Sequence, residues 1–501
     1  MEKKEFNCAY VLLTALAGRN DDHCASCEGD SFTRRTFRQS ISKRRRLFQS
    51  HGISRETRTI VISSRGSAFW IDMIALWSLA AIPIPLEKDI SEDHATEIFS
   101  SSQPTHFIGE FGTLPPAFGT LKSVDGAMPS TLELARETLE QFEVESVGSG
   151  ALAGLFYTSG TTGLPKGVMI RHDMLISNMY ATQSRIQLRP MDRLFIAIPF
   201  RFISSISHFL VAILAGAVFV GTEKRLMPKN LIAELEHNEI TAFGGAPIQL
   251  RFIAEAASKA LKLLRWVMSS GDHLSTEIIE SLTNHRPDIE VHTVYGLTEV
   301  AGRLCTLSPG LTQRALGSVG SAIPGMVVEV RNDSDEKCKP FEVGHVYAKG
   351  NCCFAGYIAN EKATAKALTS CGFKTGDLGY LDDNGHLYLS GRSDSVFKRS
   401  GLKVSCLPIA DALMATGFFS DATVLPREDK IFGAVPIAYV VMKDDLTFLQ
   451  REVMKALRPL LPANHLPADF VKLDIIPRTG SGKVIRNALF QKLEEKAGQR
   501  T

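Results

Sequence analysis

Residues 157–168, with the sequence YTSGTTGLPKGV, combine the groups that a protein uses to bind an anion. Gly160, Gly163 and Gly167 allow positive φ angles, which turn backbone N–H groups towards a bound anion. Lys166 adds a positive charge, and the hydroxyl side chains add hydrogen-bond donors. Because a short apolar run precedes the stretch, we expect a loop that leaves a strand and binds the phosphates of a nucleotide. The residues assigned to this phosphate loop are Thr158, Ser159, Gly160, Thr161, Thr162, Gly163 and Lys166.

The composition of the phosphate loop leaves a second interpretation open, because stretches rich in glycine, serine and threonine are often flexible turns. The common nucleotide-binding pattern G-x-x-x-x-G-K-[ST] does not match, since counting from Gly160 places Pro165 at the second glycine. The stretch closely resembles the phosphate loop of the adenylate-forming superfamily. This superfamily includes acyl-CoA synthetases, luciferases and the adenylation domains of non-ribosomal peptide synthetases.

Residues 294–300, VYGLTEV, resemble the superfamily motif Tyr-Gly-x-Thr-Glu. An isolated string of this type is also typical of a strand end followed by a helix cap. The resemblance implies that Glu299 binds Mg²⁺, that Thr298 hydrogen-bonds the α-phosphate and that Tyr295 stacks along the adenine. Gly296 belongs to the same nucleotide-binding motif. A carboxylate suits Mg²⁺ because hard cations prefer oxygen ligands.

Residues 269–275, SSGDHLS, resemble the adenine-side loop of the superfamily, and an ordinary turn is the alternative. The resemblance implies that Gly271 and Asp272 lie at the edge of the base. Asp272 and His273 replace a small residue and a proline of the usual motif, so the roles of these two side chains stay open.

Residues 374–379, KTGDLG, resemble the motif whose aspartate accepts hydrogen bonds from both ribose hydroxyls. This task suits a carboxylate, which has two acceptor oxygens, and it falls to Asp377. By the same resemblance Arg392 reaches the ribose or a phosphate. Asp394 occupies the position of the superfamily's hinge, about which a small C-terminal domain turns.

Beyond the hinge, residues 395–404 resemble the segment that faces the active site during thioester formation. Lys398 and Gly401 match the lysine and the glycine of that segment. The acidic triplet Glu-Ile-Glu that usually follows is replaced by Pro408, Ile409 and Ala410. The effect of this replacement on the thiol side of the site stays open.

A further lysine lies in residues 477–486, PRTGSGKVIR, which resemble the last motif of the superfamily. Without that context, Lys483 in its Gly-Ser-Gly setting is typical of a mobile surface residue. The resemblance implies that the charge of Lys483 offsets the repulsion between the acid carboxylate and the α-phosphate while the bond between them forms.

The acid pocket is predicted from the segments that line it in the superfamily, and these segments are mostly apolar here. Such a lining favours an aryl or medium-chain acyl acid over a charged one. No aspartate lies between Pro199 and Val220 to bind an ammonium group, which disfavours an amino acid. The residues assigned to the acid pocket are Phe200, Phe202, Ile203, Phe243, Gly245, Ala301 and Gly302.

The chain of 501 residues is too long for one compact core, so we expect two or more domains. Alternating strand and helix signals predict an α/β fold with parallel sheets and with ligands at the carboxyl ends of the strands. From Gly317 onwards, β-type alternation and the turn at Asn384 and Gly385 predict a small antiparallel, barrel-like subdomain. We assign residues 1–393 to a large N-terminal domain that binds ATP and the acid. Residues 394–501 form a small mobile α+β domain.

Two stretches near the N-terminus have compositions that are also found in nucleic-acid-binding or membrane proteins. Residues 34–46 are strongly basic, but Phe37 and Phe48 share one helical face, which favours a solvated amphipathic helix over a surface for nucleic acid or membrane. Residues 69–86 are apolar but interrupted by Asp72 and two prolines. We therefore expect a buried helix followed by a strand, and no membrane span.

Composition excludes several classes of protein. The 56 basic and 54 acidic residues give a net charge of +2, so no general attraction to nucleic acid is expected. Nine cysteines, an odd number spread over a long chain, are not typical of a disulfide framework, and we expect no zinc site at Cys24 and Cys27, since no second pair at ligand spacing is evident. The first residues lack the basic-then-apolar layout of a secretion signal, so we expect none. We expect a cytoplasmic protein, either a monomer or a homodimer.

The resemblance implies two half-reactions at one site. A small-molecule carboxylic acid and Mg-ATP give acyl-AMP and pyrophosphate with Lys483 in the site, and the C-terminal domain then rotates so that a thiol can attack. We expect CoA as the acceptor, with the phosphopantetheine of a carrier protein in trans as the alternative. A purely adenylating enzyme and a luciferase-like oxidising enzyme share most of these motifs. Glu299 and Lys483 argue against a nucleotide-binding protein without activity.

Overall fold

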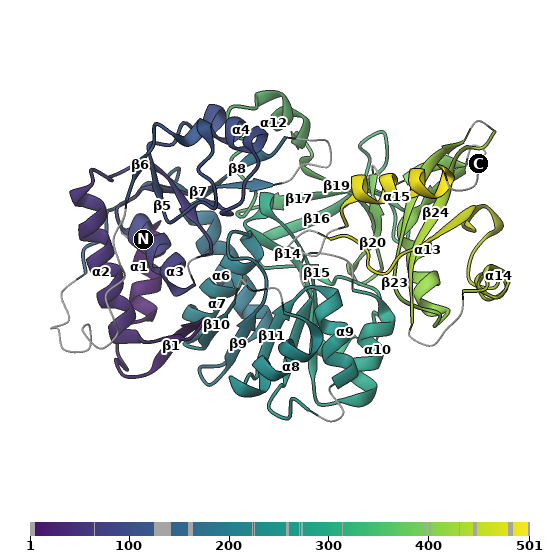
Figure 1. The fold of residues 1–501 in the computed structure, drawn as a ribbon, viewed down its shortest axis with the longest axis horizontal. Coiled ribbons are helices and arrows are strands. Elements are labelled where there is room, and N and C mark those ends of the chain that lie inside the picture. The colour runs from purple at the N-terminus through teal and green to yellow at the C-terminus, as the bar shows by residue number, and fades with distance from the viewer. Residues whose placement is uncertain are drawn as a thin grey trace.

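The computed structural model arranges the chain as a large N-terminal part and a smaller C-terminal part (Figure 1). Helix α1 (Cys8–Ala15) lies at one end of the molecule, and α15 (Arg486–Gly498) lies towards the other. The mixed α/β architecture predicted from the sequence is confirmed. The structure describes residues 6–64, 66–124, 142–158, 164–222, 224, 226–256, 260–269, 271, 274–312, 314–393, 396–399, 402–429, 431–443, 448–478 and 484–498.

A small parallel sheet forms first along the chain. Its order is β4 (Ile82–Leu86), β3 (Arg58–Ile62), β5 (His106–Ile108) and β6 (Lys122–Ser123). Helix α3 (Ser67–Ser78) connects β3 to β4, and each of its residues is buried. Because a helix buried on all sides needs no polar face, its sequence is apolar nearly throughout. The predicted buried helix between two strands is therefore confirmed.

A nine-stranded sheet forms the centre of the N-terminal part. The strands from β13 to β1 run parallel, and the strands at both edges are antiparallel. The order is β15 (Ser321–Ala322), β14 (Gly302–Leu307), β13 (Glu290–Leu297), β12 (Trp266–Ser269), β11 (Ala242–Gly245), β9 (Arg193–Ile196), β10 (Val218–Gly221), β1 (His23–Cys27) and β2 (Asp30–Thr33).

Helices cover both faces of this sheet, and the alternation of side chains along each strand follows from that cover. Leu194 and Ile196 of β9 join the hydrophobic cluster of α6 (His172–Ile186) and α7 (Ile203–Ala215). Phe195, between them, joins the cluster on the opposite face. The helices of that second face are α8 (Pro228–His237), α9 (Pro247–Ala256) and α10 (Thr276–His285).

The hairpin of β1 and β2 was not predicted, because its residues are mostly small or polar and its alternation is short. Cys24 and Cys27 lie on β1, and each is 1% exposed. Burial raises the pKa of both thiols to about 12. These two cysteines are therefore protonated packing residues at neutral pH.

The basic stretch forms α2 (Arg34–Ser50), as predicted, and Phe37 and Phe48 are buried. The expectation that its charged side chains are solvated is wrong for Arg44, which is 1% exposed. The Nε atom of Arg44 donates to Oδ1 of Asp72 on α3 at 2.6 Å. Asp72, which interrupts the apolar pattern of α3, is thus the partner of a charge on another helix.

The predicted antiparallel subdomain is a five-stranded sheet. The turn that contains Gly385, with φ +76°, joins its last two strands. The strands are β16 (Met326–Arg331), β17 (Gly344–Gly350), β19 (Gly372–Leu381), β18 (Leu368–Thr369) and β20 (Leu387–Arg392).

The C-terminal part has a sheet of its own and two hydrophobic clusters made of its own residues. Helices α13 (Cys406–Ala415) and α14 (Gln450–Leu457) pack on this sheet. The strands are β22 (Leu402–Ser405), β21 (Val396–Arg399), β24 (Gly433–Met442), β23 (Phe419–Asp429) and β25 (Asp469–Lys472).

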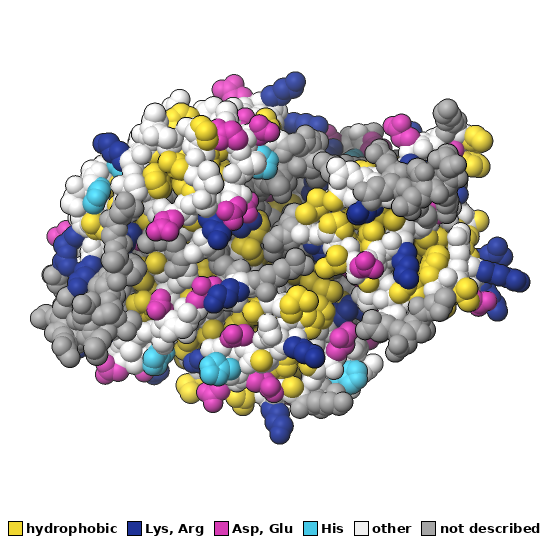
Figure 2. Space-filling model, in the orientation of Figure 1, with side chains coloured by type: hydrophobic (Ala, Val, Ile, Leu, Met, Phe, Trp, Pro, Cys, Tyr) yellow, Lys and Arg dark blue, Asp and Glu magenta, His cyan; other side chains and the backbone are white. Residues whose placement is uncertain are grey.

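Acidic and basic side chains are interspersed over the face of the molecule shown in Figure 2. Among the helices of the described residues, none has the length and apolar character needed to cross a membrane.

Candidate active site

The phosphate loop connects two antiparallel strands, β7 (Leu152–Thr158) and β8 (Lys166–Arg171). Thr158 and Lys166 face each other as the last pair of this hairpin, and Ser159, Gly160, Thr161, Thr162 and Gly163 lie outside the described residues. The expectation of a longer loop that includes Lys166 is therefore wrong. The end of a hairpin still places Lys166 at the base of the loop that connects the two strands.

Gly167 lies within β8 and has no positive φ angle, so the reason predicted for this glycine is wrong. A Cβ atom at this position would lie 2.6 Å from Cγ2 of Ile358 and 2.8 Å from the ring of Tyr157. The close approach of two other segments therefore requires glycine here.

Glu299 lies in a short 3₁₀ turn (Thr298–Val300) directly after β13. The hydroxyl group of Tyr357 donates to Oε1 of Glu299 at 2.8 Å. The Nζ atom of Lys166 lies 5.4 Å from the centre of the Tyr357 ring. The structure thus brings together a cation at the base of the phosphate loop and the carboxylate assigned to Mg²⁺, with Tyr357 between them.

Sequence reasoning missed Tyr357, because a single tyrosine in a connecting segment gives no signal of its partner. Burial raises the pKa of Tyr357, and the negative charge of Glu299 raises it further. The phenol is therefore protonated at neutral pH and acts as the donor in this hydrogen bond. It fixes one oxygen of Glu299 and leaves Oε2 without a hydrogen bond from the described residues.

The arrangement at Glu299 fits a hard divalent cation. The carboxylate is half-buried, positioned by a hydrogen bond, and has one oxygen left for a ligand. Among the described residues, no group of three histidine, cysteine, aspartate or glutamate side chains could hold a metal ion. The described residues thus provide one carboxylate, and phosphate oxygens of a nucleotide would have to supply further ligands.

Asp377 lies on β19 and is 7% exposed. Its Oδ1 accepts a hydrogen bond from Nη1 of Arg392 at 3.2 Å, and its Oδ2 accepts one from the hydroxyl group of Tyr295. Burial raises the pKa of Tyr295 well above its ordinary value, and the Asp377 charge adds to the shift. The three residues assigned to the nucleoside are therefore neighbours, although they come from three strands.

Some of the remaining predicted site residues are described in the structure, and others are not. Gly271 follows β12 with φ +97°, a conformation that favours glycine. A Cβ atom at Gly296 would lie 2.1 Å from the carbonyl oxygen of Gly302, so the antiparallel neighbour β14 requires this glycine. Lys398 is exposed on β21. Asp272, His273, Asp394, Gly401 and Lys483 lie outside the described residues.

The predicted acid pocket is not one cavity in this structure. Phe200 is fully buried against Trp70, with ring centres 4.9 Å apart, on the α7 face of the sheet. Phe243 is fully buried against Phe195, with ring centres 6.3 Å apart, on the opposite face. Phe243 points from β11 to the same face as its neighbour Phe195, whereas Phe200, in the segment between β9 and α7, packs on the other face. The assignment of both rings to one pocket is therefore wrong here.

The other predicted pocket residues lie nearer to the end of the sheet. Phe202 packs beneath the guanidinium group of Arg201, with 4.4 Å from Cζ to the ring centre, and Ile203 is 8% exposed. Ala301 and Gly302 have positive φ angles between the turn of Glu299 and β14. A Cβ atom at Gly245 would meet the ring of Phe243.

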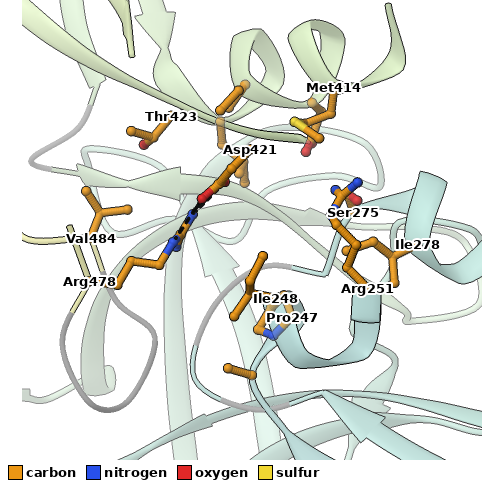
Figure 3. A pocket seen from close by; sticks show the side chains of 15 residues that line it. Pro247, Ile248, Arg251, Ser275, Ile278, Met414, Asp421, Thr423, Arg478 and Val484 are labelled. Atoms are coloured by element: carbon orange, nitrogen blue, oxygen red, sulfur yellow. Dashed lines mark hydrogen bonds and ion pairs between the residues drawn. The ribbon is translucent and has the colours of Figure 1, made fainter. Parts of the chain in front are cut away.

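A cavity of about 120 Å³ lies between the N-terminal and C-terminal parts (Figure 3). Pro247 and Arg251 of α9 line one side, and Ala410 of α13 lines the other. Arg478, which donates to Asp421 at 2.9 Å, closes a further side, together with Val484, the residue that follows Lys483. The position where the superfamily has a glutamate, Ala410, thus contributes an apolar wall to this cavity.

Comparison with known proteins places the chain in a family. Residues 13–358 match the family model described as AMP-binding enzyme, and residues 409–483 match the AMP-binding enzyme C-terminal domain. The first match covers more than half of the chain. The protein therefore belongs to the AMP-binding enzyme family.

Among curated proteins, the chain is similar to the 2-succinylbenzoate–CoA ligase of Bacillus subtilis (strain 168). The two are 28% identical over 358 residues, which are 71% of this chain and 72% of that protein.

Solved structures show the same fold. The o-succinylbenzoate CoA synthetase of Bacillus subtilis has been solved with its acyl-adenylate intermediate and with ATP and a magnesium ion. Both structures have a TM-score of 0.83 and 23% identity, and they cover 96% of this chain and 97% and 99% of their own. An anthranilate CoA ligase with anthranoyl-AMP has a TM-score of 0.88 at 18% identity over 98% of both chains.

Proposed function

We propose that the protein is an acid–thiol ligase that activates an aryl or medium-chain acyl acid as acyl-AMP and transfers the acyl group to CoA. The match to the AMP-binding enzyme family over most of the chain carries this proposal. Two features of the structure support it: the positioned carboxylate of Glu299 and the buried group of Tyr295, Asp377 and Arg392. The names of the relatives, which are CoA ligases, favour CoA over a carrier protein in trans.

For the nucleotide we propose the following roles. Asp377 accepts hydrogen bonds from the ribose hydroxyls, for which it exchanges part of its present contacts with Tyr295 and Arg392. The hydroxyl-rich loop after Thr158 and the charge of Lys166 bind the phosphates. Glu299, held by Tyr357, supplies an oxygen ligand to Mg²⁺, which offsets phosphate charge when it is bound.

The carboxylate oxygen of the acid attacks the α-phosphorus of ATP, and the bond to pyrophosphate breaks. We propose that Lys483 lies between the two anions and lowers their repulsion as this bond forms. In the second step the thiol sulfur attacks the acyl carbon, the thiol loses its proton and AMP leaves.

For the second step we propose that residues 394–501 rotate as a domain about Asp394 relative to residues 1–393. This rotation withdraws Lys483 and presents Lys398 and Gly401 to the site. The separate hydrophobic clusters of the C-terminal part support a unit that moves as one body.

Acid-dependent release of pyrophosphate tests the first step directly. The purified protein is incubated with Mg-ATP and a panel of aryl, medium-chain and amino acids, with and without CoA, and the products are identified by mass spectrometry. We expect pyrophosphate with aryl or medium-chain acids, and an acyl-CoA when CoA is present. Acyl-AMP that is never passed to CoA would instead favour a carrier protein as acceptor, and no pyrophosphate from any acid would refute the proposal.

The variant Lys483→Ala separates the two half-reactions. We expect adenylation to fall by at least about 10²- to 10³-fold, because one preorganised cation is lost. Thioester formation from supplied acyl-AMP should stay near the wild-type rate. Lys472→Ala, which changes an exposed lysine on β25, is the matched control. An equal loss in both half-reactions would contradict the role of Lys483.

A further inference from the structure

Arg303 on β14 is a buried cation without a counter-ion among the described residues. It is 3% exposed. Its Nη1 donates to the hydroxyl group of Ser207, and its Nη2 lies 3.5 Å from the sulfur of Met268. Its Nε atom has no hydrogen-bond partner among the residues that the structure describes. None of the carboxylates that the structure describes forms an ion pair with this guanidinium group.

Such a group is unfavourable to bury, because a charge removed from water is normally paired or fully hydrogen-bonded. Burial lowers the pKa of Arg303 to about 9, so the side chain keeps its charge at neutral pH. A hydroxyl oxygen and a thioether sulfur are neutral and weak partners for a guanidinium group with five N–H donors. Within the part of the chain that the structure describes, this interior positive charge is therefore not compensated.

The position of this charge relates it to the proposed reaction. Arg303 follows Glu299 by four residues, across the turn of Ala301 and Gly302. Met268, which its guanidinium group contacts, lies in β12 and pairs with Gly244 of β11 near the carboxyl ends of both strands. Ligands bind outside these ends in open α/β sheets. The guanidinium group therefore lies beneath the carboxyl ends of these strands, where the proposed function expects the acid to bind.

His208 on α7 borders the same place. A Cβ atom at Gly244 would lie 2.5 Å from its Nε2, which has no hydrogen-bond partner in the described part of the chain. Its Nδ1 donates to the carbonyl oxygen of Ser204 at 2.6 Å. Burial, followed by the charge of Arg303, holds the pKa of His208 well below its ordinary value. His208 is thus neutral, and the local positive charge belongs to Arg303.

We propose that Arg303 binds a second carboxylate of the acid substrate, remote from the carboxylate that is activated. The proposal rests on the proposed function and narrows its substrate class to aryl or acyl dicarboxylic acids. A carboxylate matches the planar fork of a guanidinium group and cancels one charge. A phosphate group with two charges would need a further cation, and Arg303 is accompanied here by a neutral histidine.

Binding requires that the present neighbours of Arg303 give way. The Ser207 hydroxyl rotates freely, and Met268 has a flexible side chain that can change rotamer at low cost. Arg303 then exchanges a hydroxyl and a sulfur contact for a bidentate ion pair.

Matched pairs of acids test this assignment in the wild-type protein. One member of each pair carries two equivalent carboxylates, and in the other a methyl group replaces one of them, so the monoacid keeps the carboxylate that is activated: terephthalate with 4-methylbenzoate, and adipate with hexanoate. We expect kcat/KM for pyrophosphate release to favour the diacid of at least one pair by at least about 100-fold, since a site with an unpaired buried donor rejects an analogue that cannot satisfy it.

The variant Arg303→Met keeps an unbranched side chain, although a shorter one, and removes the charge. We expect it to lower the ratio of kcat/KM between diacid and monoacid by at least about 100-fold, through a higher KM for the diacid, with the monoacid changed less than about threefold. Arg303→Lys should retain part of the preference. Arg185→Met, which removes a half-buried guanidinium group that donates to the carbonyl oxygen of Ala322 at 3.2 Å, is the matched control and should keep the wild-type ratio.

The outcomes separate this inference from the proposed function. A wild-type preference for the monoacid of both pairs, or an equal loss for diacid and monoacid in Arg303→Met, overturns the role of Arg303 and leaves acid activation intact. No pyrophosphate from any acid refutes the proposed function, and calorimetric binding of the same pairs to both proteins then decides the role of Arg303. If Arg303→Met does not fold, the wild-type ratios and Arg303→Lys decide it.

Discussion

Two buried arginines in different regions of the molecule differ in whether a carboxylate is paired with them. Arg44 on α2 is 1% exposed and forms an ion pair with Asp72 at 2.6 Å. Its guanidinium carbon also lies 4.8 Å from the centre of the Phe48 ring. Arg303 on β14 is 3% exposed and contacts a hydroxyl group and a sulfur atom. Equal burial therefore does not imply an equal role.

The contrast between the two arginines distinguishes a charge that stabilises the fold from a charge that is available to a ligand. The helices of Arg44 and Asp72 lie at the N-terminal end of the molecule, whereas β14 lies in its middle (Figure 1). A charge that serves the fold has its partner in the chain, and removal of either partner leaves the other buried and unpaired. A charge that serves a ligand is paired only when the ligand is bound, and until then it lowers stability.

The largest effect is expected at the paired arginine. Asp72→Ala leaves Arg44 buried without its carboxylate, which should lower the free energy of unfolding by about 3–5 kcal/mol. Chemical denaturation followed by tryptophan fluorescence reports on this region, because Trp70 and Trp77 lie on the same helix as Asp72. Asp288→Ala, which breaks the exposed ion pair with Arg286, should change stability by less than about 1 kcal/mol. Equal effects in both variants would contradict the structural role of the Arg44 pair.

Replacement of both partners tests whether the loss of stability in Asp72→Ala comes from the unpaired charge of Arg44. Arg44→Met combined with Asp72→Leu removes both charges and fills the space with apolar side chains. We expect this double variant to recover most of the stability lost in Asp72→Ala, because a buried ion pair is often replaceable by hydrophobic packing. A double variant as unstable as Asp72→Ala would show that the loss comes from packing rather than from the unpaired charge.

An intermediate effect is expected at Glu299, a carboxylate whose hydrogen-bond donor is in the chain. Tyr357→Phe removes the hydrogen bond to Oε1, and we expect kcat for acid-dependent pyrophosphate release to fall about 10-fold, or about 1.4 kcal/mol. Tyr347→Phe removes a comparable hydrogen bond, to Asp335 at 2.7 Å in the antiparallel sheet, and should keep kcat within about twofold. The same loss in both variants would mean that Tyr357 acts through general stability.

The smallest effect on stability is expected at the unpaired arginine. Arg303→Met removes a buried charge that has no counter-ion among the described residues, so the free energy of unfolding without ligand should change by less than about 1 kcal/mol or should rise. The measurement is the same denaturation experiment as for Asp72→Ala. A decrease of about 3 kcal/mol or more in the free energy of unfolding would show that Arg303, like Arg44, stabilises the fold. This result would contradict the difference drawn between the two arginines.

Much of the fold could be predicted because its signals are local. The alternation of strands and helices in the N-terminal part depends on the periodicity of apolar residues within short windows. The hairpin of β1 and β2 escaped prediction because Ser26, Asp30 and Ser31 weaken that periodicity. The antiparallel course of β7 and β8 also escaped, because a strand and its loop have the same local pattern whichever partner the strand takes.

The candidate site was likewise predicted only in part. Motif resemblance pointed to Asp377 and Glu299, whose surroundings in the structure fit oxygen donors to a ribose and to a cation. It could not point to Tyr357, because the identity of a hydrogen-bond donor depends on what packs nearby. It misassigned Phe200 and Phe243 to one pocket, because the side of the sheet on which a ring packs depends on the helices that cover that side.

Most of the strands and helices, the motif residues and the family resemblance could be read from the amino-acid sequence, because each depends on residues close together in the chain. The tertiary structure decided which charges are paired and which are left for a ligand. Arg44 and Asp72 are 28 positions apart, Glu299 and Tyr357 are 58 apart, and Ser207 and Arg303 are 96 apart. The energy of a charge depends on the groups around it in space, and only the folded chain brings those groups together.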